Sequence, residues 1–585
     1  MTMLRDAPAR QEESSAIQAG RAALKRWRES IPRNFFACDP NLARVLAMYR
    51  PDFPDIEPRL RAFGREVATV IDAAATLNDR IPNHPRLERW NGIGERTEAI
   101  QFHPSYHEAG RPAYQAGLVA LQEEPGHVME QAALFYLLTQ AGEMGHACPL
   151  VCTMGLVRAL QAHGSPELKA RFLPPLLERD YDRKQTASQF LTEVQGGSDV
   201  GANATVATPV PGQPGVWRLN GEKWFCSVAN ADQMLITARP EGAPPGTKGL
   251  GLFLLPRRLP DGRLNGFFLR RLKDKFGTRT MASGEMDFQE ALAYQVGEIH
   301  EGFHIAAGIV LNTSRWANAL GSAGLLRRAY VEAWHFAQAR EAFGHPIARY
   351  PLVQEALAEM KTDVQAMLAS TLRLSHLLER QDTGQASDQE RRVFRLLVNI
   401  NKYWTSIQAS LGIRRAQEIL GGNGAIEEFS VIPRLYRDAV VFESWEGSHN
   451  VLCLQAARDM RRYGLHQDFF AYLARLLENA RRPELAEQHR AAQEALDRVQ
   501  QRVDRLLGSD ATFYQSHVRR VVEELAQVSQ AVCLLAEAAW EREQGLDSEK
   551  PQVLTFFLNR YLRPGYEPLD DPGYAARLAG LVQEL

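Results

Sequence analysis

A glycine cluster followed by a carboxylate is the pattern in this chain that is best suited to chemistry. The cluster comprises Gly421, Gly422 and Gly424, and the carboxylate is Glu446, which directly follows Trp445. Glycines let a backbone approach a phosphate or an aromatic ring because they carry no Cβ atom. A glutamate beside bulky aromatic residues is expected to be partly desolvated, which raises its pKa and makes it a stronger base near neutral pH. The pattern therefore predicts proton abstraction beside a bound cofactor.

The composition is that of an ordinary soluble protein with several domains. The chain has 585 residues, of which 45% are apolar and 24% are charged, and its net charge is −2. This balance excludes a global field that would attract nucleic acid or anionic lipid. Six scattered cysteines predict reduced thiols rather than a metal site, and neither a signal peptide nor a membrane span is expected. The expected location is the cytoplasm.

The elements that must position these residues change in character along the chain. Apolar residues recur at helical spacing up to about residue 174, β-type runs between turn dipeptides follow, and helical spacing returns at Ile305. The expected fold is α+β and mainly α: an N-terminal helical domain, a central antiparallel β domain, a C-terminal four-helix bundle and an extra C-terminal helical extension. The expected boundaries are 1–184, 185–300, 301–460 and 461–585.

Some local patterns make finer predictions. The polar segment 82–104 predicts a long ordered connection, and the dipeptides Asn220-Gly221 and Asp261-Gly262 predict tight hairpin turns. The apolar stripes of the extension are expected to pack on the body of the protein. A membrane-binding or oligomerisation module is the alternative for this segment.

Motifs in a fixed order resemble those of the acyl-CoA dehydrogenase family over roughly residues 100–460. They are Thr192–Asp199, Gly221–Ser227, Arg340–Ile347, Gln417–Gly424 and Trp445–Gly447. The first is similar to the flavin motif Thr-Glu-x-x-x-Gly-Ser-Asp of that family. Within the family, the chain most resembles the AidB-like branch, which is named for the adaptive response to alkylating agents.

The resemblance implies an FAD-dependent dehydrogenase that converts an acyl-CoA to a trans-2-enoyl thioester. Glu446 would be the catalytic base, and hydride would pass from the β-carbon to flavin N5. The implied cofactor-binding residues are Leu191, Thr192, Gly197, Ser198, Phe225, Ser227, Arg340, Phe343, Gln417, Gly421, Gly422, Gly424 and Ser448. The implied substrate-binding residues are Ser198, Arg315 and Gly447. No metal ligand is implied.

Some positions depart from the family pattern or compete with it. Ser314 stands where some relatives carry the base, which favours Glu446, and Glu443 is the nearest competing carboxylate. Phe225 and Ser227 replace the usual Trp and Thr but keep an aromatic face and a hydroxyl group. Pro351 replaces a common Gln, so one hydrogen bond on the adenylate side is not expected here.

The resemblance also implies partners. In the family, the residues resembling Arg340 and Gln417–Gly424 reach the flavin of a neighbouring subunit, which implies a homodimer or homotetramer. Electrons would pass to an electron-transfer flavoprotein. The AidB likeness offers a second hypothesis, a flavoprotein that associates with DNA and protects it from alkylation. Residues 461–585 disfavour it, because 16 Lys and Arg against 19 Asp and Glu give a charge of −3 where DNA requires a basic face.

Overall fold

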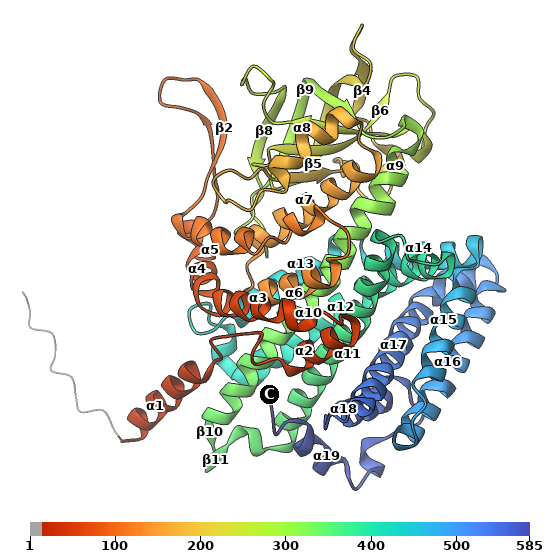
Figure 1. Cartoon of the computed structure of the whole chain (residues 1–585). Coiled ribbons are helices and arrows are strands. Elements are labelled where there is room, and N and C mark those ends of the chain that lie inside the picture. The colour runs from red at the N-terminus through yellow and green to blue at the C-terminus, as the bar shows by residue number, and fades with distance from the viewer. Residues whose placement is uncertain (1–14) are drawn as a thin grey trace, which may run out of the picture.

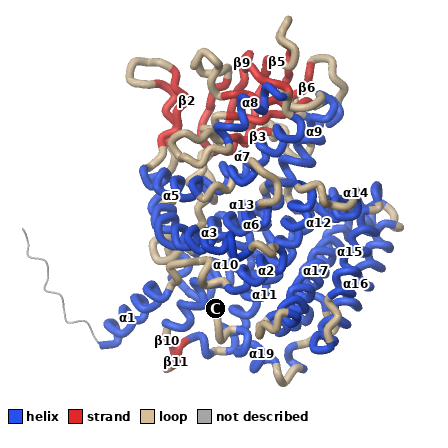
Figure 2. Tube along the Cα trace, in the orientation of Figure 1, coloured by secondary structure: helices blue, strands red, loops and turns tan. Residues whose placement is uncertain are grey.

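The computed structural model describes residues 15–585, so residues 1–14 of the first expected domain lie outside the described part. Most strands gather at one end of the molecule, a short hairpin at residues 341–346 lies at the other, and helices form the rest (Figure 2). In Figure 1 the β domain lies at the top, the long central helices run below it, and the last helices, in blue, cover one side. Within residues 15–585, no helix has the length and apolar character needed to cross a membrane.

The N-terminal part is helical, as expected. Side-chain caps begin several of its helices: the carboxylate of Asp39 accepts from the Leu42 N–H before α2, and the hydroxyl of Ser165 accepts from the Leu168 N–H before α8. The helices α6 and α7 are buried on almost every side. The helix bounds are α1 Ser15–Ser30, α2 Pro40–Tyr49, α3 Phe53–Glu66, α4 Asp72–Asn78, α5 Pro104–Gln115, α6 Val128–Thr139, α7 Met144–His163 and α8 Pro166–Leu176.

The segment 82–104 is a β-hairpin rather than only a connection. Strands β1 (Arg86–Trp90) and β2 (Arg96–Gln101) pair antiparallel, and the Asn91 N–H donates to the Glu95 carbonyl at the turn. The hairpin projects from the body (Figure 1). Its first strand is mostly exposed, so it lacks the alternation of buried and exposed residues by which a strand is predicted from sequence.

The central β domain is confirmed, although not every pairing is antiparallel. Its sheet has the order β3-β6-β4-β5-β9-β7, with β8 beside β9 and a further β6–β7 pairing. β6 pairs parallel with β3 and β4, and the other pairings in this sheet are antiparallel. The strand bounds are β3 Ala187–Phe190, β4 Val206–Pro209, β5 Val216–Ser227, β6 Gln233–Pro240, β7 Gly251–Pro256, β8 Phe267–Leu272 and β9 Ser283–Gln295.

The prediction of a hairpin turn at Asn220-Gly221 is wrong. β5 runs through this dipeptide without interruption, and its register with β9 shifts between Leu219 and Gly221. Gly221 has φ +146°, and a Cβ atom there would lie 2.8 Å from Thr205 Cα. The glycine therefore permits a bulge and a close approach of two strands, which are the other uses of glycine within a strand. Asp261-Gly262 does lie in a tight loop, closed by a bridge between Arg258 and Leu264.

The long helices of the bundle follow one another through short connections and therefore alternate in direction. A capping box at Ser387 and Glu390 starts α12. Its start thus lies near the end of α11, and its last residues lie near the start of α11 and the end of α10. The bounds are α9 Gly302–Ile305, α10 Leu311–Ala339, β10 Glu341–Ala342, β11 His345–Pro346, α11 Pro351–Asp382, α12 Asp388–Leu420 and α13 Ile432–Ser444.

The C-terminal extension packs on the bundle, as its apolar stripes predict. The predicted boundary at 460 falls inside α14, and we propose Gly464, which is left-handed at φ +66°, as the junction. Helix α17 contacts α11 and α12 along the interface. The bounds are α14 His449–Tyr463, α15 Leu465–Asn479, α16 Ala486–Leu507, α17 Ala511–Glu543, α18 Lys550–Phe557 and α19 Tyr574–Leu581. The four-part division of the chain otherwise stays a prediction.

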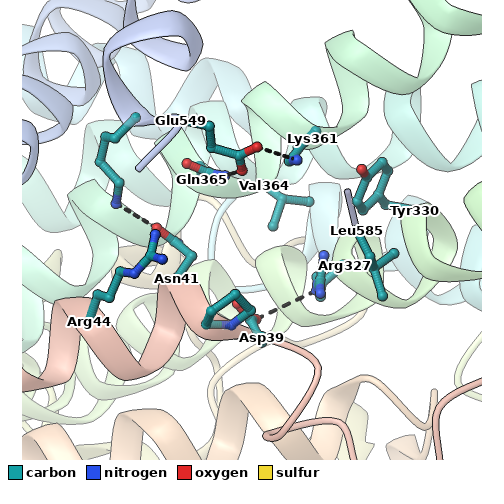
Figure 3. Close-up of a pocket in the computed structure, with 12 residues that line it drawn as sticks. Asp39, Asn41, Arg44, Arg327, Tyr330, Lys361, Val364, Gln365, Glu549 and Leu585 are labelled. Carbon is teal, nitrogen blue, oxygen red and sulfur yellow. Dashed lines mark hydrogen bonds and ion pairs between the residues drawn. The ribbon is translucent and has the colours of Figure 1, made fainter. Parts of the chain in front are cut away.

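Buried ion pairs fasten the extension to the body around a small cavity of about 30 Å³. Lys361 of α11 pairs with Glu549 at 2.5 Å, and Gln365 donates to the same carboxylate at 2.9 Å (Figure 3). Lys550 donates to Asn41 of α2 and pairs with Glu537 of α17 at 2.5 Å. The extension is therefore tied to the body by charged and polar contacts as well as by apolar packing.

Candidate active site

Glu446 lies in a short loop that two other helices hold in an unusual conformation. The loop follows the end of α13, and Glu446 has φ +57° while Gly447 has φ +110°. A left-handed non-glycine residue costs about 1–3 kcal/mol and persists only where its surroundings fix it. Here the Nε of Arg315, from α10, donates to the Glu446 carbonyl at 3.0 Å, and its Nη1 donates to Asn399 of α12 at 2.7 Å. The loop is therefore tied to the bundle through its backbone.

The surroundings of the Glu446 carboxyl group suit a base. Burial raises the pKa of Glu446, while the positive charges of Arg315 and Lys402 and a hydrogen bond from Gln189 act in the opposite direction. The Gln189 amide lies 3.4 Å from Glu446 Oε1 and 2.9 Å from the hydroxyl of Ser314. Glu446 is thus desolvated enough to gain basicity and has cations that favour its ionised form.

Neither Gln189 nor Lys402 was among the site residues predicted from the sequence. Gln189 lies in β3, two residues before Leu191, and it reaches Glu446 across 257 residues of chain. Lys402 lies in the middle of α12. No local motif marks either residue, because their roles arise only from long-range packing. A glutamine just before the Thr192 motif was the available signal for Gln189, whereas Lys402 stands among other polar residues of α12, such as Asn401 and Thr405, and is not marked by its neighbours.

The loop that resembles the flavin motif lies close to this carboxylate. The Trp224 N–H donates to the Thr192 carbonyl at 2.9 Å, and the Asn203 amide donates to the Leu191 carbonyl at 3.0 Å. A Cβ atom at Gly197 would lie 2.4 Å from the Thr192 hydroxyl, so the turn excludes larger residues there. Gly197 and Ser198 are exposed. The turn therefore presents exposed backbone and a hydroxyl group to a ligand.

A buried ion pair between Lys223 and Glu193 stabilises the loop that follows Thr192. Lys223 of β5 pairs with Glu193 at 2.7 Å, and Glu193 also accepts hydrogen bonds from Ala204 and Thr205. Burial alone would raise the pKa of Glu193, but Lys223 and these hydrogen bonds lower it to about 2. Because the folded-state pKa is depressed, the pair stabilises the fold above about pH 4.3 and loses this contribution as the pH falls through about 2.

We expect Glu193→Gln to lower the free energy of unfolding at pH 7 by about 3–5 kcal/mol, because it leaves the Lys223 ammonium buried without a carboxylate. The free energy of unfolding of the variant should also fall less steeply than that of the unmodified protein as the pH is lowered. Urea unfolding between pH 3 and pH 7 measures both. Glu222→Gln, which loses a partly exposed contact with Arg270, is the matched control and should cost about 1 kcal/mol or less. Equal losses in the two variants would contradict this role for Glu193.

Phe225 and Ser227 lie near the end of β5, where its register with β9 shifts between Lys223 and Cys226. Phe225 is 54% exposed although it is a large aromatic residue, and the ammonium of Lys273 lies 4.9 Å from the centre of its ring. Val228, which follows Ser227, packs in one apolar cluster with Trp445 beside Glu446. The structure therefore brings the end of β5 close to the loop that carries Glu446.

The remaining predicted residues lie at the other end of the bundle. Arg340 directly follows α10 and is exposed, and Phe343 in the next turn is 95% exposed with φ +51°. Twenty-five residues separate Arg315 from Arg340 along α10, which at 1.5 Å per residue is about 37 Å. The hairpin β10–β11 accordingly lies at the bottom of Figure 1, far from the β domain.

The glycine cluster lies at this second end too, because it follows the last residue of α12. A Cβ atom at Gly424 would lie 2.4 Å from the Gln417 carbonyl oxygen, and Gly421 has φ +61°. Gly422 has open space around it. Within one chain the predicted residues therefore form two groups: Leu191, Thr192, Gly197, Ser198, Phe225, Ser227, Arg315, Glu446, Gly447 and Ser448 at one end, and Arg340, Phe343, Gln417, Gly421, Gly422 and Gly424 at the other.

A cavity of about 460 Å³ opens beside the start of α10. Asn312 and Thr313 line it, one turn before Arg315, together with Arg158 of α7 and Asp382 of α11, which form an ion pair at 2.6 Å. The side-chain amide of Gln122 also lines it, is buried, and has no hydrogen-bond partner within the described part of the chain. The cavity therefore offers polar groups to a ligand near the start of α10.

Comparisons with known proteins agree with this geometry. Family models match in three stretches: "Adaptive response protein AidB N-terminal domain" over 28–183, "Acyl-CoA dehydrogenase, middle domain" over 188–291 and "Acyl-CoA dehydrogenase, C-terminal domain" over 300–461. The chain is 34% identical to AidB of Escherichia coli (strain K12) over 392 residues, which are 65% of this chain and 70% of that protein. It is 30% identical to acyl-CoA dehydrogenase family member 11 of Caenorhabditis elegans over 443 residues, 73% and 70% of the two chains.

Solved structures show the same likeness. The structure of Caenorhabditis elegans ACDH-11 in complex with C11-CoA aligns with a TM-score of 0.83 at 26% identity, covering 90% of each chain. The Bd2924 apo-form aligns with a TM-score of 0.79 at 30% identity, covering 86% of this chain and 98% of that one. Together with the order of the motifs, these matches show that the chain belongs to the acyl-CoA dehydrogenase family.

Proposed function

We propose that this protein is an FAD-dependent acyl-CoA dehydrogenase that removes hydrogen from the α- and β-carbons of an acyl-CoA thioester. The observation that carries the proposal is Glu446: its carboxyl group is desolvated, two buried cations favour its ionised form, and its backbone is held in a strained conformation. Perturbed carboxylates on a fixed loop beside a cofactor motif are typical of catalytic bases.

In this proposal the Glu446 carboxylate removes the α-proton of the thioester. Burial raises the pKa of Glu446 and strengthens the base, and Arg315 and Lys402 favour its ionised form. The backbone N–H of Glu446 would donate to the thioester oxygen, where negative charge develops. FAD, when bound, accepts the hydride from the β-carbon. Arg315 already donates to Glu446 and Asn399, so we assign it to positioning the loop more than to contacting substrate.

We propose that each flavin is held by two copies of the chain. The turn at Thr192–Ser198 and the exposed face of Phe225 fit a planar ring and its pyrimidine edge, and the Ser227 hydroxyl fits a ring nitrogen. Arg340 suits a pyrophosphate. About 37 Å along α10 separates Arg340 from Arg315, which lies at the end of the bundle where the Glu446 loop is held, so Arg340 of the same chain lies far from that loop. A homodimer, or a homotetramer built from such dimers, would bring them together.

The cavity beside Asn312 and Thr313 supports an elongated thioester substrate. The start of α10, the helix that carries Arg315, lines it, and its amide and hydroxyl groups match the amides of a pantetheine arm. Ser198 and Gly447 would contact the acyl end. The proposed electron acceptor is an electron-transfer flavoprotein, and the proposed location is the cytoplasm.

The test is a product assay on the purified protein. Incubation with a panel of acyl-CoAs and an artificial electron acceptor should give, for at least one of them, a product lighter by the mass of two hydrogen atoms. Mass spectrometry of the CoA esters measures this loss. If every ester keeps its mass, the proposed reaction is wrong.

The DNA hypothesis receives less support. The arginines that are candidates for a basic face on the extension make contacts within the chain: Arg461 donates to Leu507, Arg482 pairs with Glu543, and Arg519 donates to Tyr403. Binding to duplex DNA requires cations that are free to replace counterions. Retained binding to duplex DNA at near-physiological salt would favour this hypothesis.

A further inference from the structure

Lys402 is a buried lysine placed directly behind the loop that carries Glu446. Its side chain has no exposed surface, and its ammonium group lies 3.0 Å from the Glu443 carbonyl and 3.0 Å from the Gly447 carbonyl. These two carbonyls flank Glu446 on either side. One ammonium group therefore joins the end of α13 to the residue after the proposed base.

The partners of this lysine differ from those of other buried lysines in the chain. Lys223, Lys361 and Lys550 each have a carboxylate oxygen within 2.7 Å. Within residues 15–585, no carboxylate lies within 4.0 Å of the Lys402 ammonium, and burial lowers its pKa to about 7. A desolvated ammonium bonded only to neutral carbonyls is costly, which makes a structural contribution alone a poor explanation for it.

The backbone carbonyls of the Glu446 loop require buried hydrogen-bond donors. Glu446 and Gly447 both have positive φ angles, and their carbonyls accept hydrogen bonds from side chains of α10 and α12. Arg315 accounts for the Glu446 carbonyl at 3.0 Å. Lys402 accounts for the carbonyls of Glu443, three residues earlier, and of Gly447. Two buried cations thus hold consecutive parts of one strained turn, and Glu446 carries the negative charge that complements both of them.

We propose that Lys402 is a positioning residue for the proposed dehydrogenation: it holds the left-handed turn at Glu446 through the carbonyls of Glu443 and Gly447, and its charge keeps the Glu446 carboxylate ionised and directed at the substrate. This inference rests on the proposed function. Its chemistry is that of a fixed cation that stabilises a base without touching the reacting atoms.

Other charged groups face Lys402 from each neighbouring element, and all of them remain in the variants below. Arg315 approaches from α10, Glu443 and Glu446 from the end of α13, and His449 from the start of α14. Arg519 of α17 is further away and acts on His449 rather than on Lys402. A change in the pH profile on replacing Lys402 alone therefore reports the loss of this one charge.

The experiment compares Lys402→Met, which removes the charge and the donors, with Lys402→Arg, which keeps the charge but changes the geometry. For Lys402→Met we expect kcat to fall about 10- to 100-fold with KM changed less than about threefold, and the acid limb of log(kcat/KM) to move to higher pH by about one unit. Lys402→Arg should keep the position of the acid limb while kcat falls less. Lys361→Met, at another buried lysine of the bundle, is the matched control. It should change neither kcat nor the pH at which the acid limb of log(kcat/KM) lies.

A second measurement does not depend on turnover. In a crystal structure of Lys402→Met, the backbone of Glu446 should leave the left-handed region or its carboxylate should turn from the position found here. If Lys402→Met does not fold, Lys402→Arg still tests the loop conformation and kcat, because a longer planar group does not reproduce both carbonyl contacts. The inference is overturned if Lys402→Met keeps the loop conformation, the acid limb and kcat of the unmodified protein, or, where only Lys402→Arg folds, if Lys402→Arg keeps the loop conformation and kcat. If instead the unmodified protein oxidises no acyl-CoA, the proposed function fails, and the loop structure still decides whether Lys402 positions Glu446.

Discussion

Glu446→Gln should lower kcat for acyl-CoA oxidation by about 10³-fold or more, while the fold and the flavin content stay unchanged. The amide is close in size to the carboxylate but does not accept the α-proton, and a positioned general base contributes about 10²- to 10⁴-fold on its own. Steady-state kinetics and exchange of the α-proton with deuterated solvent measure the loss. Both should fall together, because proton removal is the step that disappears.

Glu443→Gln is the matched control, since Glu443 is the nearest competing carboxylate, three residues earlier. Its side chain is partly exposed and lies 3.9 Å from the His449 ring. Its carbonyl, which Lys402 uses, remains in the variant. We expect kcat to change less than about threefold. A loss in Glu443→Gln equal to that in Glu446→Gln would show that the base has been assigned to the wrong residue.

Dimers that combine two inactive chains should recover half of the activity. In a dimer of one Glu446→Gln chain and one Arg340→Ala chain, the site formed by the second chain's Glu446 and the first chain's Arg340 is intact, and the other site has lost both groups. Loss of a charged hydrogen-bond pair with a pyrophosphate weakens flavin binding about 10- to 100-fold. At limiting FAD, each homodimer of these variants should therefore be nearly inactive.

The reverse combination is the control for this result. A dimer of one unmodified chain and one chain with both substitutions has one altered group in each site, so it should stay inactive. Two affinity tags, one on each chain, isolate the mixed dimers, and activity per flavin is compared at equal protein. If instead the reverse combination keeps half of the activity and the first combination has none, each flavin is held by one chain only.

The sequence was informative for the elements that are determined by residues near one another in the chain. The β-type runs and turn dipeptides predicted the β domain, and the apolar stripes of the extension predicted its packing on the body. The dipeptide Asn220-Gly221 misled because glycine serves bulges as well as turns, and only the pairing of β5 with β9 distinguishes the two. The exposed hairpin β1–β2 lacked the apolar alternation that marks a strand.

The candidate site shows the same limit. Glu446 could be singled out from its neighbours, but the groups that act on its carboxylate and backbone, among them Gln189, Arg315 and Lys402, come from three separate elements. Their distances from Glu446 depend on how helices α10 and α12 pack against β3 and α13. The separation of Arg340 from Glu446 likewise follows from the length and direction of α10. Such relations are set by packing, which a single sequence does not display.

Anaerobic mixing of the purified flavoprotein with acyl-CoAs tests the central claim most directly. The proposed reaction predicts that at least one acyl-CoA bleaches the visible absorbance of the bound flavin, one flavin for each enoyl product, and that Glu446→Gln does not bleach with the same ester. A flavin that stays yellow with every acyl-CoA, or that bleaches equally in the Glu446→Gln protein, would contradict the account.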